Sequence, residues 1–76
     1  MLAKIVGLQQ ISFQNPDGKV IEGTKIFTEY PDENVMGVKT EAFFVKQGIK
    51  FPESLKAGEQ VNIYFNQKGK VEAITK

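Results

Sequence analysis

The 76-residue sequence contains no cysteine, no histidine, no tryptophan and no arginine. Without cysteine there can be no disulfide framework and no thiol chemistry, and without histidine there is no imidazole for acid–base catalysis. The two absences together remove the thiolate and imidazole ligands of the usual zinc sites. All ten basic side chains are lysines, and nine acids nearly balance them, so the formal net charge is +1.

Long hydrophobic runs are also absent. No apolar stretch approaches the roughly 18–20 residues that a membrane span requires, and the opening MLAKIVGLQQ lacks the apolar core of a signal peptide. A chain of this length forms one small domain with no room for a large cleft. We therefore expect a single domain over residues 1–76 that is soluble and cytoplasmic, with no membrane contact and no small-molecule substrate.

What is present is a pattern of short apolar and β-branched segments separated by turn signals. Asn15-Pro16-Asp17-Gly18 suits a type I turn that closes a hairpin, and Pro52 to Gly58 suits one short helical turn that starts at proline and stops at glycine. The pattern predicts five strands and no long helix. The expected strands cover residues 2–14, 19–30, 37–47, 61–66 and 70–75.

The first expected strand changes its apolar phase midway. Leu2, Val6 and Leu8 occupy even positions, whereas Ile11 and Phe13 occupy odd ones. Because side chains alternate between the two faces of a strand, such a change needs a kink or an extra residue. We expect a β-bulge near residues 7–10, which bends this strand around a barrel.

These elements suit a five-stranded Greek-key barrel with one short helical turn between strands three and four. Closing the sheet removes the exposed edges that would promote aggregation of a small β domain. An all-β fold of the OB type is our first expectation. An SH3-like barrel, which has a similar size and a similar helical turn, is the alternative.

The sequence gives little support for an enzyme. The nearest acidic pair, Asp32 and Glu33, lies in a loop and has no third ligand nearby, so we expect no metal site. Gly23-Thr24-Lys25 resembles the end of a phosphate-binding loop, but it lies inside a strand and lacks the upstream glycine. We expect no catalytic residues and no cofactor.

The surface of strands two and three carries the functional signal. If Thr24, Ile26, Thr28 and Tyr30 face the interior on one strand, and Val38, Thr40, Ala42 and Phe44 do so on the other, the remaining aromatics point outward. Phe27 and Phe43 then lie on adjacent strands, flanked by Lys25 and Lys39. Outward aromatics beside lysines suit base stacking with lysine–phosphate contacts. The alternative is that Phe27 and Phe43 belong to the core.

Two more residues are candidates for the same surface. Tyr64 lies on a strand that alternates cleanly, so we expect it to be exposed, either to stack a base or to contact another subunit. Lys46 leaves the third strand and extends the basic surface. Residues 39–56 hold four lysines and two acids, whereas residues 17–33 hold two lysines and five acids, so a near-neutral chain can still have a basic face.

The order of elements, together with GTKIFTEY in the second strand and LKAGEQVNIYFNQKGKVEAI near the end, resembles small OB-fold single-stranded-DNA-binding proteins. The similar class is the gene V-type proteins of filamentous phages and their counterparts on mobile elements. The resemblance implies a dimer that coats single strands during replication or transfer. It would put Lys25, Phe27, Lys39 and Phe43 at the binding surface.

The sequence thus predicts sequence-tolerant binding of single-stranded DNA, or of RNA, with a homodimer as a further possibility. Because the net charge is small, we expect this binding to depend on stacking and to weaken quickly with salt. The alternative is a protein–protein interaction or assembly module that uses the same exposed aromatics.

Overall fold

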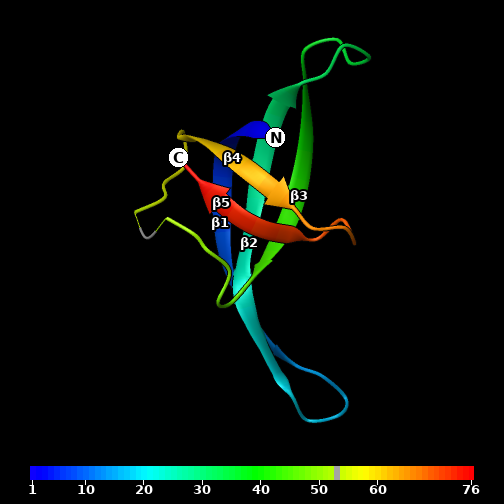
Figure 1. The fold of residues 1–76 in the computed structure, drawn as a ribbon, viewed down its shortest axis with the longest axis vertical. Coiled ribbons are helices and arrows are strands. Elements are labelled where there is room, and N and C mark those ends of the chain that lie inside the picture. The colour runs from blue at the N-terminus through cyan, green and yellow to red at the C-terminus, as the bar shows by residue number, and fades with distance from the viewer. Residues whose placement is uncertain (53) are drawn as a thin grey trace.

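A computed structural model describes residues 1–52 and 54–76, and it shows an all-β chain. No helix occurs in the described part, so no helix that could cross a membrane is found there. The five strands, drawn in Figure 1, are β1 (Leu2–Gln14), β2 (Val20–Pro31), β3 (Val38–Lys46), β4 (Gln60–Phe65) and β5 (Val71–Thr75). These bounds confirm all five expected strands, with every strand end within one residue of the expected position.

The strands form one antiparallel sheet in the order β3-β2-β1-β4-β5. β1 is the central strand. It pairs with β4 through its first residues, Leu2 to Lys4, and with β2 from Lys4 to Gln14. The sheet curls so that β4 and β5 cross in front of β1, β2 and β3 (Figure 1).

A β-bulge bends β1. The register with β2 shifts between Ile5 and Gly7, so Val6 is the extra residue. The expected bulge is therefore confirmed, although it lies one residue before the range in which it was expected. An extra residue increases the local twist of a strand, which suits a strand shared by both halves of a curled sheet.

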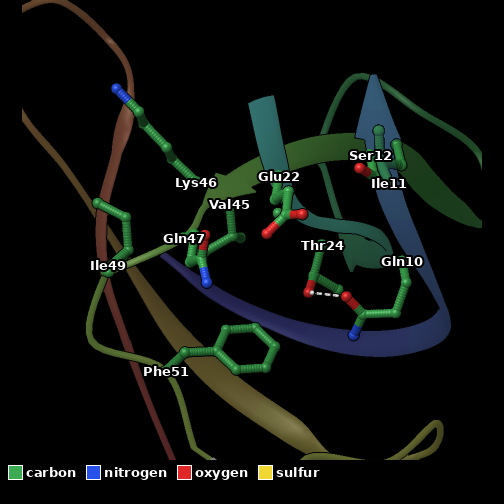
Figure 2. A pocket seen from close by; sticks show the side chains of 12 residues that line it. Gln10, Ile11, Ser12, Glu22, Thr24, Val45, Lys46, Gln47, Ile49 and Phe51 are labelled. Atoms are coloured by element: carbon green, nitrogen blue, oxygen red, sulfur yellow. Dashed lines mark hydrogen bonds between the residues drawn. The ribbon is translucent and has the colours of Figure 1, made fainter. Parts of the chain in front are cut away.

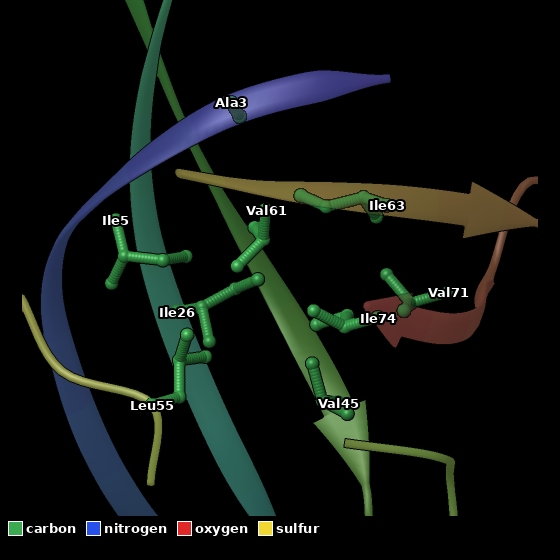
Figure 3. Packing of buried hydrophobic residues seen from close by; sticks show 9 residues of the cluster. All are labelled: Ala3, Ile5, Ile26, Val45, Leu55, Val61, Ile63, Val71 and Ile74. Carbon is green, nitrogen blue, oxygen red and sulfur yellow. The ribbon is translucent and has the colours of Figure 1, made fainter. Parts of the chain in front are cut away.

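The core lies between the two halves of the sheet (Figure 3). It contains nine buried apolar side chains drawn from all five strands and the loop before β4: Ala3, Ile5, Ile26, Val45, Leu55, Val61, Ile63, Val71 and Ile74. On β1 the buried residues are Ala3 and Ile5, whereas Leu2, Val6 and Leu8 are exposed. Of the three apolar residues from which the bulge was inferred, Leu2 lies on the outward phase and Val6 is the extra residue. Leu8 pairs with the buried Ile26 and so shares the inward phase, although it is 39% exposed.

Two hairpins have turns of the same design. Gly18 N–H donates to the Asn15 carbonyl (2.9 Å), and Gly69 N–H donates to the Asn66 carbonyl (3.0 Å). Both glycines have positive φ, 90° and 78°, a conformation that side chains disfavour. The expected β-turn after β1 is confirmed, and the positive φ that follows it suits a three-residue hairpin loop.

The sheet does not close into a barrel by strand pairing. β3 and β5 are its two end strands and contact each other, but the described residues form no ladder between them. The free side of β5 is instead met by the loop after β3, where Ile74 N–H donates to the Lys50 carbonyl (2.9 Å). The expected helical turn is not found in the described residues of the Pro52–Gly58 segment, which form turns. Glu53, within that segment, lies outside the described residues.

A tight turn before β4 is fastened to β1. The Ile5 N–H donates to the Glu59 carbonyl (2.8 Å), and the Gly58 N–H donates to the Ile5 carbonyl (2.7 Å). The Glu59 carboxylate accepts hydrogen bonds from Lys76 Nζ and from the Lys56 N–H, both at 2.8 Å. The Lys76 contact, followed by the Lys56 one, holds the pKa of Glu59 below its ordinary value despite some desolvation.

This lowered pKa predicts a pH-dependent contribution to stability. Because the folded pKa of Glu59 lies below the unfolded one, its contribution is present above the unfolded pKa and is lost as the pH falls through the folded pKa. We expect Glu59→Gln to lower the thermal unfolding midpoint at pH 7, and the difference from wild type to vanish at the acid end of a circular dichroism pH series. Glu72→Gln, on exposed β5 surface, is the control. A Glu59→Gln deficit that persists unchanged in acid would contradict the assignment.

Candidate nucleic-acid interface

The outer face of β1, β2 and β3 is the side turned away from the core. On β2, Ile26 and Thr28 are fully buried, so their neighbours Lys25 and Phe27 point outward. This confirms the predicted phase of β2 and the outward position of Phe27, which is 36% exposed. The Lys25 ammonium lies 5.5 Å from the centre of the Phe27 ring, within the range of a cation–π contact.

The ring of Phe27 lies against Gly7 of β1. The two residues are partners in the β1–β2 ladder, and a Cβ placed on Gly7 would lie 3.4 Å from Phe27 Cδ2. Gly7 follows directly after the bulge at Val6. The bulge and the absent side chain together give the Phe27 ring a flat floor of backbone on the neighbouring strand.

A second phenylalanine repeats this arrangement on β3. Phe44 is 39% exposed and is the ladder partner of Lys25. A Cβ placed on Gly23 would lie only 2.6 Å from Phe44 Cζ and 2.4 Å from the Val45 carbonyl oxygen. Phe44 therefore packs closely over Gly23. Each outward ring covers a glycine of the adjacent strand, and Lys25 separates the two rings.

The predicted phase of β3 is wrong. Val45 is buried, and Phe43 packs against the core, with its ring 5.4 Å from that of Phe65 at an interplanar angle of 59°. Phe43 therefore does not lie beside Phe27, and Phe44 occupies that surface instead. β3 carries apolar residues in both phases, so alternation alone could not determine which set faces the core.

Lys39 shares the inward phase of Phe43 and so lies on the opposite face from Lys25. Its ammonium is 6.0 Å from the centre of the Tyr30 ring, and the Tyr30 hydroxyl donates to the Glu41 carboxylate. That hydrogen bond, together with desolvation and the nearby negative charge, raises the pKa of Tyr30 above its ordinary value. The three side chains cover the far side of the β2–β3 hairpin rather than the outer face.

Lys46 and Tyr64 have different outcomes. Lys46 follows Phe44 on the same phase of β3 and is exposed, so it extends the outer face as expected. Tyr64 is exposed, as expected from its strand, at 48%. It lies on β4, however, and this strand belongs to the half of the sheet that crosses in front of β1–β3 (Figure 1). Its neighbour Ile63 is buried in the core, so Tyr64 lies on the outside of that half and not on the outer face of β1–β3.

Alternation also sorts the charges of these three strands. Lys4, Lys25, Lys46 and Glu29 fall on the outer face, and Glu29 is 3.8 Å from Lys4. The other charged side chains of β1–β3, which are Glu22, Lys39 and Glu41, fall on the opposite phase. The outer face therefore carries three lysines and one partly neutralised acid. A nearly neutral chain thus presents a basic face through strand alternation rather than through a charged segment.

We define the outer strip by Phe27, Phe44, Lys25 and Lys46. Phe13 of β1, 48% exposed, falls on the same face nearer the β1–β2 turn. Sequence reasoning missed Phe44 and Phe13. The signal that points to Phe44 is Gly23, because a glycine inside a strand often marks the close approach of another group.

A separate cavity of about 390 Å³ lies on the other side of the sheet, at the open end between β1–β2 and the loop after β3. Figure 2 shows Gln10, Thr24 and Glu22 above the ring of Phe51, with Thr24 donating to Gln10 Oε1 at 3.4 Å. Lys46 points away from these groups (Figure 2). Among the described residues that line the cavity, Glu22 is thus the one ionisable side chain directed into it, and a single carboxylate makes neither an acid–base pair nor a metal site.

The described residues contain no group of three or more His, Cys, Asp or Glu side chains placed to hold a metal ion. No protein-family model, no curated protein and no solved structure matches the chain.

The close contacts of Phe44 with Gly23 and of Phe27 with Gly7 predict how alanine substitutions at these glycines change the stability of the fold. We expect Gly23→Ala to destabilise the fold by about 1–3 kcal/mol, because the new methyl group overlaps the Val45 carbonyl and the Phe44 ring. Gly7→Ala is the matched control, since its methyl group makes an ordinary contact with Phe27, and we expect a change below about 0.5 kcal/mol. Urea unfolding followed by far-UV circular dichroism measures both. Equal effects would show that Phe44 does not pack on Gly23 as described.

Proposed function

We propose that this chain binds single-stranded nucleic acid, with DNA as the first candidate, on its outer strip. The observation that carries the proposal is the pair of exposed phenylalanines, Phe27 and Phe44, each seated on a glycine and separated by Lys25. Flat aromatic faces held rigidly at a surface can stack with any base, which gives binding without sequence preference.

The spacing of the two rings supports stacking on separate bases. Phe27 pairs with Ala42, and Phe44 is two residues further along β3, so the rings belong to diagonal neighbours about 7–8 Å apart at the backbone. Lys25 and Lys46 lie next to them in the same phase, where their ammonium groups can follow the phosphates. Lysine contacts release counterions and so make binding depend on salt.

The topology supports an OB-type domain as the scaffold. A central β1 shared by two halves, with β3 and β5 meeting at the open side, suits a partly open five-stranded Greek-key barrel. In such domains the face of strands two and three, with the β1–β2 and β4–β5 loops, binds oligonucleotides. Here these loops carry Lys19, Lys68 and Lys70.

Binding of a labelled oligothymidine, followed by fluorescence anisotropy, tests the stacking surface. We expect Phe27→Ala and Phe44→Ala each to weaken binding by about 5-fold to 100-fold, since stacking contributes about 1–3 kcal/mol per base. Tyr64→Ala is the control, because Tyr64 is an aromatic on the other half of the sheet that is more exposed than either phenylalanine, and the change should leave the affinity unaltered. If wild type does not bind even at low salt, the proposal fails.

The salt dependence of the same assay tests the lysines. Lys25→Gln should reduce the slope of log affinity against log salt by about 0.7, the value for one phosphate contact on a single strand. Lys56→Gln makes the same change at an exposed position in the loop before β4 and should leave the slope unaltered. An equal loss of slope in Lys56→Gln would show that the lysines of the outer strip do not make the phosphate contacts. The alternative function is a protein–protein interaction or assembly module. It would be favoured if the wild-type protein oligomerised through Phe27 and Phe44 and did not bind nucleic acid.

A further inference from the structure

β3 has an unpaired edge. It pairs with β2 along its whole length, from Val38 to Lys46, and no other strand in the described chain pairs with its far side. Figure 1 shows the first half of β3 running beside β2, beyond the place where β4 and β5 cross. An exposed edge of this length is a template for another strand, and natural proteins usually block it or use it.

The ladder determines which backbone groups face this edge. Gln47 N–H donates to the Glu22 carbonyl (3.1 Å), one step beyond the last β2–β3 pair. Hydrogen-bonded pairs alternate in an antiparallel ladder, so the odd-numbered residues of β3 bond to β2. The even-numbered residues direct their N–H and C=O groups to the free edge: Val38, Thr40, Ala42 and Phe44.

The charges on β3 are self-complementary about Thr40. If two copies pair antiparallel with Thr40 opposite Thr40, then Lys39 of each copy lies opposite Glu41 of the other. A register centred one residue earlier would oppose Lys39 to itself, and one centred one residue later would oppose Glu41 to itself. Opposite charges directly across a ladder stabilise it, and like charges destabilise it. The charge pattern therefore selects the register centred on Thr40.

The same register covers exposed apolar side chains on the outer face. Val38, 51% exposed, lies opposite Ala42 of the second copy, and the fully exposed Met36 of the β2–β3 loop comes toward its Phe44. Hydrophobic burial thus adds to the backbone hydrogen bonds. A two-fold axis through this pairing is perpendicular to the sheet, so both outer strips lie on one continuous face.

We propose that the free edge of β3 is a homodimer interface, in which two copies pair antiparallel in the register centred on Thr40. The inference stands on the edge, its charges and its apolar neighbours, and it does not depend on nucleic-acid binding. Sedimentation equilibrium without nucleic acid therefore tests it separately from the proposed function.

Charge reversal is the main experiment. Lys39→Glu and Glu41→Lys each turn two attractive contacts into repulsive ones, and each should raise the dimer dissociation constant about tenfold or more. An equimolar mixture of the two variants should recover dimerisation, because the mixed pair restores opposite charges at both contacts. The double variant should also dimerise like wild type. Lys46→Glu, the same charge change near the end of β3, is the control.

The proposal is wrong if the wild-type protein is still a monomer at about 1 mM, where even a weak dimer would form. It is also wrong if the two charge-reversal variants dimerise as well as wild type, or if their equimolar mixture does not recover dimerisation. Circular dichroism shows whether each variant folds. Lys39→Glu keeps the Tyr30–Glu41 hydrogen bond, so it remains informative if Glu41→Lys does not fold.

A cysteine substitution tests the register. The chain has no cysteine, so Thr40→Cys introduces a single thiol. Only residue 40 meets its own copy in this register, at a backbone spacing of about 5.5 Å that permits a disulfide. Mild oxidation should cross-link Thr40→Cys much faster than Val38→Cys or Ala42→Cys. Faster cross-linking at position 38 or 42 would rule out this register.

Discussion

The structure depends on β1 serving two partners at once. Its first residues pair with β4 and the rest pair with β2, so the strand must bend between the two pairings. The extra residue Val6 allows this bend. Ile5, just before it, is fully buried and is hydrogen-bonded to the turn at Gly58–Glu59. One bulge thus sets the curl of the sheet, the position of the core and the fastening of the chain before β4.

The same bulge shapes the outer surface. Past Val6 the phase of β1 is reset, so Gly7 faces outward under Phe27 while Ile26 of the adjacent β2 faces the core. Phe27 and Phe44 remain outside, each in close contact with a glycine of the neighbouring strand. Such rings would lose little freedom on stacking, which would favour the proposed binding to a flexible single strand.

Local sequence signals predicted the elements well, because each has a short-range physical cause. Residues 2–14 form β1 as expected, and Pro16 and Gly18 form the turn that their backbone preferences favour. The face of β3 was not predictable in this way. Phe43 and Phe44 are adjacent and equally apolar, so the choice between them depends on Phe65 and on the space over Gly23, both distant in sequence. The misplaced face of Lys39 has the same cause.

Strand pairing, and not the net charge of the chain, determines which charged side chains share one face of the sheet. A net charge of +1 with no arginine would argue against a nucleic-acid surface if charges were spread at random. Alternation instead directs Lys25 and Lys46 outward and Glu22 and Glu41 to the other phase. In the proposed dimer, pairing two such sheets edge to edge would double the outward lysines on one face, and Lys39 and Glu41 of opposite copies would neutralise each other across the pairing. A modest charge per chain would then suffice for the proposed binding, because salt-dependent contacts to a continuous strand add up along the surface.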